Sequence, residues 1–422
     1  MKKTLILVVL LMTSGCSTYT AKMELSRDFY YDGEYENAIT GVDELVGKAS
    51  NNDIHLFLAE RGKMRLAAGQ YDSAIVDLQR AEKRFHEIEG TISISEMVKT
   101  SVKSAGSMEY QPESHEKIMI NTYLLLAYWL KGDAEGAFVE RNRVAGRLKK
   151  YTDQLSQEDW EKLDVPFARY LVALLYEMEG LADDARIEYD EVNKIYPEAR
   201  PAGENTFLTE IVVFAEMGRG PVKVSREIKG YFNKDAGNLL GFFELPGASG
   251  PLMVNAGSLG SFSPTDGVVF SFAFPQYIRQ PRIAARCSVV FDSIEAADAV
   301  LLDNIEETAM TAFGKDIGKI LLKAAVRTCL QTLAQEKISD KKGGMVFDLL
   351  GKAFSAIDKA DTRSWQTLPA EVRVFRMECD PGDHEVLLNY YDGSGAILGS
   401  SRTVRFSVEK GKKQIIYLPG PS

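Results

Sequence analysis

The chain has 422 residues, of which 45% are hydrophobic and 26% charged. This composition is typical of a globular protein and excludes a disordered, collagen-like or polytopic membrane chain, while the length predicts two or three folding units of roughly 150 residues each. The 60 acidic residues outnumber the 50 Lys and Arg residues, so the formal net charge is −10. Because nucleic acid backbones attract basic surfaces, we expect no nucleic acid partner.

The N-terminus has the pattern of a secretion signal. Two lysines at positions 2 and 3 precede an apolar run over residues 5–12. As a helix, that run is too short to cross the ~30 Å hydrocarbon core of a bilayer. The Thr-Ser-Gly-Cys sequence at 13–16 resembles the cleavage box of bacterial lipoproteins, with Thr13 where Leu is usual.

The resemblance implies that residues 1–15 are a lipoprotein signal peptide and that Cys16 is lipidated with acyl chains such as palmitate. Two or more acyl chains give stable membrane anchoring without a further membrane-binding element. Ser17 follows the cysteine where an Asp would favour inner-membrane retention. We therefore expect a lipid-anchored protein at the cell outer membrane, facing the periplasm. The alternative is an ordinary cleaved signal with a coincidental cysteine.

Three further cysteines remain, Cys287, Cys329 and Cys379. At most one intramolecular disulfide is possible among them, and none lies in a CxxC pair. Their neighbours are typical of element interiors, so we expect buried thiols rather than redox chemistry.

One phrase recurs four times in the first half: a Gly, an aromatic residue or Ala two positions later, and an Ala five positions later. The copies are Gly33-Tyr35-Ala38, Gly69-Tyr71-Ala74, Gly132-Ala134-Ala137 and Gly180-Ala182-Ala185. A Gly in the left-handed conformation ends a helix, and a small Ala lets the next helix cross it closely. The phrase therefore predicts helical hairpins.

This spacing resembles the tetratricopeptide repeat, with Pro197 at the position that closes the second helix of the last copy and residues 87–117 as an insertion. Stacked hairpins of this type leave a concave surface that binds a peptide or extended segment. Charged and polar side chains near the apolar helix sequence at 123–129 are the candidates for lining that groove: Glu116, Asn121, Glu140, Arg141 and Arg143. The alternative is that they lie on solvated helix faces and form local pairs.

After Pro201 the pattern changes to runs rich in β-branched and aromatic residues, at 207–214, 222–224, 268–274 and 284–291. These runs predict strands. Helical periodicity returns at about 293–337 and at 345–357, and we expect those helices to pack on the middle strands. Four strand-like runs separated by Gly-rich turns within 365–422 predict a small β-sandwich.

The predicted fold is therefore a multidomain α+β chain. A tetratricopeptide-like α-solenoid at 16–200 precedes a mixed α/β region at 201–364 and a small all-β domain at 365–422. Short sequences, among them Gly-Pro-Val-Lys at 220–223 and Trp-Gln-Thr-Leu-Pro at 365–369, together with this order, resemble a family of uncharacterised bacterial lipoproteins. The resemblance implies an envelope location and carries over no catalytic residue.

The sequence contains no recognisable catalytic or metal-binding motif. The four His residues are scattered without HExxH or Cys/His spacing, and the GxSxG and GxxxxGK[ST] motifs are missing. We therefore expect no cofactor, no metal site and no enzymatic activity.

The preferred hypothesis is a non-catalytic outer-membrane lipoprotein that serves as a periplasmic protein-binding scaffold or adaptor. Its partners would be envelope proteins in envelope assembly, secretion or cell-wall synthesis. The alternative is a cell-wall glycan-directed enzyme or glycan-binding lipoprotein that uses the C-terminal half.

The lipid anchor gives the first testable prediction. Replacing Cys16 by Ala removes the acylated thiol, so the protein should move from the membrane pellet to the soluble fraction after cell lysis. The parent chain is the control. Unchanged sedimentation of the variant with membranes would contradict lipidation.

Overall fold

A computed structural model describes residues 18–87, 109–154, 163–199, 209–235, 238–245, 250–257, 269–339 and 360–420. The expected signal peptide, its Cys16 and the expected helix at 345–357 lie outside these ranges. Helices come first along the chain and most strands follow, so the α+β class is confirmed. None of the helices in the described ranges is long and apolar enough to cross a membrane.

The first half forms four helix pairs. They are α1 (Tyr19–Tyr31) with α2 (Tyr35–Lys48), α3 (Ile54–Ala67) with α4 (Tyr71–Glu87), α6 (Ser114–Lys131) with α7 (Ala134–Gln154), and α9 (Pro166–Met178) with α10 (Ala182–Ile195). The glycine of each phrase lies between the two helices of a pair with φ between 78° and 86°. The Ala that follows is buried in every copy. We call the four pairs the helical array, and its pairs pack one after another.

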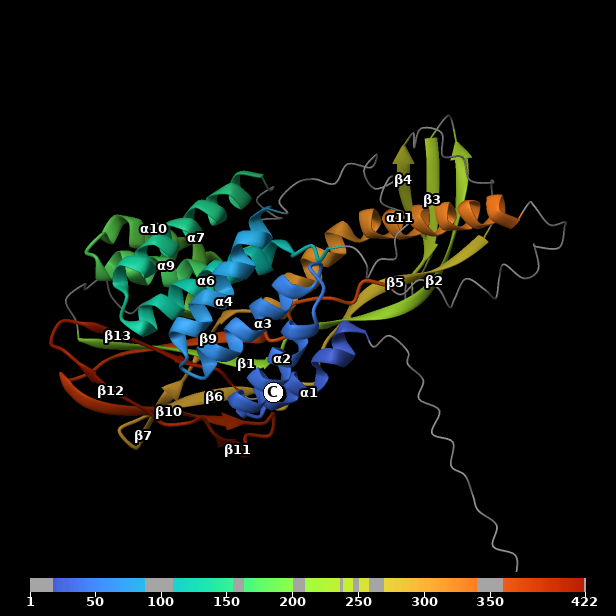
Figure 1. Ribbon diagram of the computed structural model, residues 1–422. Coiled ribbons are helices and arrows are strands. Elements are labelled where there is room, and N and C mark those ends of the chain that lie inside the picture. The colour runs from blue at the N-terminus through green and yellow to red at the C-terminus, as the bar shows by residue number, and fades with distance from the viewer. Residues whose placement is uncertain are drawn as a thin grey trace, which may run out of the picture.

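Two sheets lie below the array (Figure 1). The first, sheet A, contains β1 (Glu210–Arg219), β8 (Val300–Asp303), β9 (Pro369–Glu378) and β13 (Lys413–Leu418) in the order β13-β1-β9-β8. The second, sheet C, contains β6 (Arg286–Phe291), β7 (Ile294–Asp298), β10 (Gly382–Tyr391), β11 (Ile397–Ser400) and β12 (Val404–Val408). β1 runs parallel to β13 and antiparallel to β9.

Sheet A is the middle layer of the body. Val212 and Phe214 of β1 pack with buried residues of the helical array. The alternate residues Ile211 and Val213 pack instead with residues of sheet C, as the two-residue period of a strand requires. β1 is consequently buried over nine successive positions, which explains its nearly continuous apolar sequence.

The predicted boundary at residue 365 needs correction. β9 and β13 from the expected all-β tail flank β1 from the expected middle region. β10 likewise pairs with β6. A strand that is buried on both faces needs hydrogen-bond partners on both edges, and here the C-terminal strands supply them. Within the described ranges, 365–422 therefore forms no sheet of its own.

A separate element projects from the body (Figure 1). It comprises β2 (Val222–Asp235), β3 (Asn238–Glu244), β4 (Leu252–Gly257), β5 (Val269–Ile278) and the helix α11 (Ile305–Ser339). The four strands form sheet B in the order β4-β3-β2-β5. Ile228, Phe243 and Phe272 of the sheet pack with Phe313 and Leu321 of α11. The expectation that a helix packs on the middle strands is thus met by α11, but the predicted start of that helix at about 293 is wrong, because β7 and β8 occupy this stretch and α11 begins at Ile305.

Asp303, the last residue of β8, ties sheet A to the helical array. Its side chain accepts a hydrogen bond of 3.0 Å from the backbone N–H of Phe167 near the start of α9. The residue is 1% exposed. Burial raises the pKa of Asp303 from 3.8 to about 8, because desolvation disfavours the carboxylate more than its backbone donors favour it.

The pH dependence of the free energy of unfolding tests the burial of Asp303 between sheet A and the helical array. The folded-state pKa of Asp303 exceeds the unfolded value, so its contribution to the free energy of unfolding falls as the pH rises from about 4 to about 8. In Asp303→Asn the amide oxygen still accepts the bond and nothing ionises. As the pH rises from 5 to 9, the free energy of unfolding measured by denaturant titration should fall by roughly 2–4 kcal/mol less for the variant than for the parent. Parallel pH profiles of the two proteins would contradict this.

Candidate functional site: the inner face of the helical array

The inner face of the helical array is occupied by the chain itself. Residues 360–368, which we call the inner segment, have no regular secondary structure and lead into β9. Most of the inner segment is buried, and Gln366 and Thr367 are 0% exposed. The expected open groove is therefore filled at this place, which corrects the prediction of a concave surface available to a partner.

Glu60 of α3 binds the backbone of the inner segment. Its carboxylate accepts hydrogen bonds from the backbone N–H groups of Gln366 at 2.7 Å and Thr367 at 3.0 Å. It also accepts one from the Tyr19 hydroxyl at 2.9 Å. Burial raises the pKa of Glu60, although these donors act in the opposite direction by favouring the charged form.

Glu116 of α6, one of the predicted groove residues, binds the preceding residue of the inner segment, Trp365. Its Oε1 accepts the backbone N–H of Trp365 at 2.8 Å. Its Oε2 accepts the Tyr110 hydroxyl at 2.5 Å and the backbone N–H of Glu113 at 2.7 Å. The second of these belongs to the capping box that begins α6. Glu116 therefore forms its hydrogen bonds within the chain rather than with a partner.

Helix α1 contacts the carbonyl side of the inner segment. The Tyr31 hydroxyl donates to the backbone oxygen of Leu368 at 3.0 Å. Arg27 donates to the side-chain oxygen of Gln366 at 3.1 Å. The array thus binds both N–H and C=O groups of an irregular segment that belongs to the same chain.

A buried charge pair lies beside the inner segment. Lys63 of α3 and Glu216 of β1 form a salt bridge of 2.7 Å with side chains 0% and 3% exposed. The Tyr123 hydroxyl donates to Glu216 at 2.6 Å. Burial lowers the pKa of Lys63, while the Glu216 carboxylate acts to raise it. The pair is closed off from solvent, so it joins the array to sheet A and has no access to a substrate.

Three of the predicted groove residues form a separate cluster between α6 and α7. Asn121 donates to Glu140 at 2.9 Å, and Arg143 donates to the same carboxylate at 2.7 Å. Asn121 is 0% exposed and Glu140 2%, whereas the Arg143 side chain is half exposed. Only Arg143 of these three is placed where another molecule can reach it.

Arg141 lies at a third place, toward α9. Its guanidinium stacks over the ring of Tyr176 at 4.3 Å and pairs with Glu179. The stacking explains why a cation occupies a position that is usually aromatic or apolar, since the planar guanidinium packs on the ring face. The five predicted residues are therefore dispersed, and four of them are buried.

Sequence reasoning missed Glu60, Lys63 and Glu216. A signal was present for the first two, because they stand three residues apart in a stretch where apolar residues predominate, Leu56 to Ala67. Charges at that spacing share one face of a helix. Glu216 carried no such signal, since its partner is 153 residues away.

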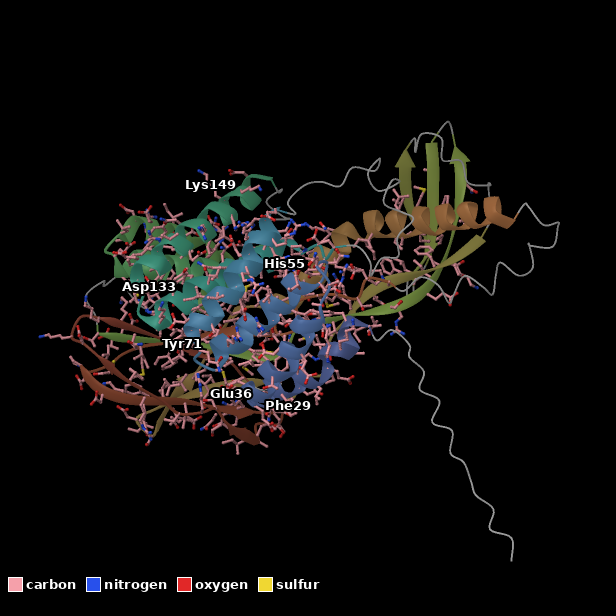
Figure 2. The ribbon with its side chains drawn as sticks, viewed as in Figure 1. Phe29, Glu36, His55, Tyr71, Asp133 and Lys149 are labelled. Carbon is pink, nitrogen blue, oxygen red and sulfur yellow. The ribbon has the colours of Figure 1, made fainter. Side chains whose placement is uncertain are left out.

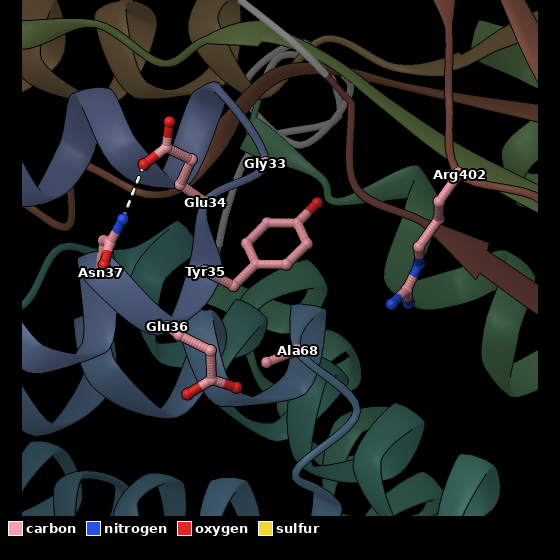
Figure 3. A pocket seen from close by; sticks show the side chains of 7 residues that line it. All are labelled: Gly33, Glu34, Tyr35, Glu36, Asn37, Ala68 and Arg402. Carbon is pink, nitrogen blue, oxygen red and sulfur yellow. Dashed lines mark hydrogen bonds between the residues drawn. The ribbon is translucent and has the colours of Figure 1, made fainter.

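An open pocket of about 390 Å³ lies at the turn between α1 and α2 (Figure 3). Its lining is Gly33, Glu34, Tyr35, Glu36, Asn37, Ala68 and Arg402. Glu34 accepts a hydrogen bond from Asn37 at 2.7 Å, and Arg402 reaches toward the pocket from the loop after β11. Glu34 and Glu36 lie in the same pocket as the exposed Arg402, so the charges of the pocket do not indicate whether a ligand would be an anion or a cation.

Ligands for a metal do not converge in the described ranges, where no group of three or more His, Cys, Asp or Glu side chains is placed to hold an ion. Cys287 and Cys379 are free thiols, and burial raises the pKa of Cys287 to about 12. The side chain of Cys329 lies outside the described residues.

No protein-family model matches the chain. No curated protein matches its sequence. Among solved structures, "Crystal structure of MamA protein" is matched at 15% identity over 42% of this chain and 72% of that one, with a TM-score of 0.26. A likeness at that TM-score carries no conclusion about function.

The contacts of Glu60 give a stability prediction. Glu60→Ala leaves two buried backbone N–H groups without an acceptor, which should lower the free energy of unfolding by about 2–5 kcal/mol in denaturant titration. Glu44→Ala is the matched control, because it removes only an exposed ion pair with Lys48 and should cost less than about 0.5 kcal/mol. Equal stability of Glu60→Ala and the control would contradict the role of the inner segment.

Proposed function

We propose that this chain is a non-catalytic, lipid-anchored protein-binding scaffold of the bacterial outer membrane that faces the periplasm, and that the outer side of the helical array is its binding element. The observation that supports this is the asymmetry of the array. The first helices α3 and α9 contain ten and eleven buried residues, whereas the second helices α2 and α10 contain only three and two. The second helices are the surface that the array offers.

Rigidity supports a scaffold role as well. The inner segment and the Lys63–Glu216 pair fix the array to sheet A through buried bonds. Removing one partner of a buried pair is costly, about 3–5 kcal/mol, so the array has a strong preference for one position on the body. A surface held in one conformation binds with little ordering cost.

The ionisable groups at the inner face favour binding over catalysis. A catalytic acid or base must come within hydrogen-bond reach of its substrate. Glu60 and Lys63 are each 0% exposed, and other groups of the same chain already occupy their hydrogen-bonding positions. Their shifted pKa values follow from burial and pairing within the fold.

The proposed anchor places the array close to the membrane. Thr18, whose side chain caps α1, follows Cys16 by two residues. Two residues of chain span at most about 7 Å. A lipid on Cys16 therefore holds α1 next to the headgroups, within reach of envelope proteins that act in envelope assembly, secretion or cell-wall synthesis.

Site-specific photo-crosslinking in the native envelope tests the function. A photoreactive amino acid replaces the exposed Ser73 on α4, and in the control it replaces Ile397 on β11, which is 60% exposed. We expect discrete protein adducts from position 73 and none from position 397.

Two results would contradict the proposal. Adducts from position 397 alone would place protein binding on sheet C rather than on the array. The absence of protein adducts at both positions, together with binding of the intact chain to purified peptidoglycan, would favour the glycan-directed alternative.

A further inference from the structure

The outer side of the helical array carries β-branched residues at equivalent positions of all four second helices. Each lies two residues after the buried Ala of the repeated phrase: Thr40, Val76, Val139 and Ile187. The three aliphatic members are 54%, 52% and 54% exposed in that order. Thr40 is exposed too. In every repeat, the same position is thus exposed to solvent and carries a β-branched side chain.

Folding gives no reason for this choice of residue. β-branched side chains are weaker helix formers than Ala, Leu, Glu or Lys, because their χ1 angle is restricted in a helix. An aliphatic group that stays half exposed also gains only part of the free energy of burial. A single exposed Val is ordinary, but recurrence at one repeat position on three helices points to contact with another molecule.

An acidic residue precedes each of these positions by four residues. The pairs are Glu36 with Thr40, Asp72 with Val76, Glu135 with Val139, and Asp183 with Ile187. Residues four apart lie on the same face of a helix, one turn from each other. All four acids are exposed. We call these eight residues the outer row.

Three of the acids have surface partners that a ligand can replace. Asp72 pairs with Lys131 at 2.7 Å, with side chains 82% and 39% exposed. Asp183 lies 3.7 Å from Arg186, and Glu36 accepts a hydrogen bond from Gln70. Ion pairs this exposed contribute little to stability, so exchange for cations of a partner costs little. An acid in the first turn also favours the helix dipole, which explains each acid singly but not the aliphatic residue one turn later.

The second helices α2, α4 and α7 follow one another along the array, which brings their three pairs onto one surface. Figure 2 shows this order through Glu36 on α2, Tyr71 at the start of α4 and Asp133 just before α7. Tyr71 and Asp133 are sequence neighbours of Asp72 and Glu135. The acids of α2, α4 and α7 therefore lie along one side of the array, and the β-branched residues lie one helical turn further along each helix.

We propose that the outer row is the docking site of a basic, aliphatic-rich protein segment. Lys and Arg side chains of the partner pair with the acids, and its aliphatic side chains pack on Val76, Val139 and Ile187. This proposal rests on the scaffold function and specifies its partner. The charge of the row selects the class, because its four exposed carboxylates outnumber the two surface cations that pair with them, Lys131 and Arg186, and this excess repels nucleic acid phosphates and anionic lipid headgroups.

The test uses the full chain and a defined probe, a synthetic amphipathic peptide of Lys and Leu, with an acidic peptide in which Glu replaces Lys. The main variant combines Val76→Ala, Val139→Ala and Ile187→Ala. We expect its Kd for the basic peptide to rise at least tenfold. Its Tm should not fall below that of the parent, because Ala is the better helix former. The control is Ile294→Ala with Ile397→Ala, two exposed positions on sheet C that should leave the Kd unchanged.

A second variant separates charge from apolar contact. Glu135→Gln with Asp183→Asn removes two carboxylates of the outer row and should weaken peptide binding while reducing its dependence on salt. The matched control is Asp298→Asn with Glu385→Gln, which removes two acids from sheet C and should leave both the affinity and its salt dependence unchanged.

The proposal is overturned if the triple Ala variant and the parent bind the basic peptide equally, or if the acidic peptide binds as well as the basic one. A fall in Tm of the triple variant would also overturn it, because that result assigns the β-branched residues a role in folding. Failure here with retained crosslinks at position 73 rejects the outer row and leaves the scaffold function standing. If the chain without these substitutions gives no crosslinks at position 73, both the outer row and the scaffold function are rejected.

Discussion

The structure depends on two buried carboxylates and the three backbone N–H groups that they bind. Glu60 and Glu116 come from the helical array, and their donors at residues 365–367 stand 249 to 307 positions later in the chain. A buried N–H group needs an acceptor and a buried carboxylate needs donors, so each side meets a requirement that the other could not meet alone. The two halves of the chain therefore fold against each other as one body, and the inner segment is the connection between them.

Other features of the body follow from this connection. β1 is enclosed by the array on one face and by sheet C on the other, and its edges are paired with strands from the C-terminal part. Lys63 and Glu216 then lie away from bulk solvent, where each charge is tolerable only because the other is present. Such a pair fixes the position of the array on the sheet, because a shifted array would leave an unpaired charge inside.

The enclosed inner face changes where function is expected. In a free array of helical hairpins the inner surface is the usual site for a peptide, but here the chain's own segment uses its polar groups. What remains accessible is the layer of second helices, where acidic and β-branched residues recur at a fixed offset from the buried Ala. The repeat thus has two roles. Its small residues build the hairpins. Its exposed positions form a periodic surface, because equivalent positions recur on each second helix.

The sequence by itself determined the local structure of the first half and the mixed class of the whole. Gly33 and its three counterparts adopt left-handed conformations, and the Ala residues are buried, because backbone geometry and close helix crossing depend only on neighbouring residues. Most strand runs were predictable for the same reason. The tertiary structure alone decided which strands pair, that Glu116 binds Trp365 rather than a partner, and that the predicted groove residues are dispersed. Those outcomes depend on contacts between residues hundreds of positions apart, and local sequence patterns contain no information about them.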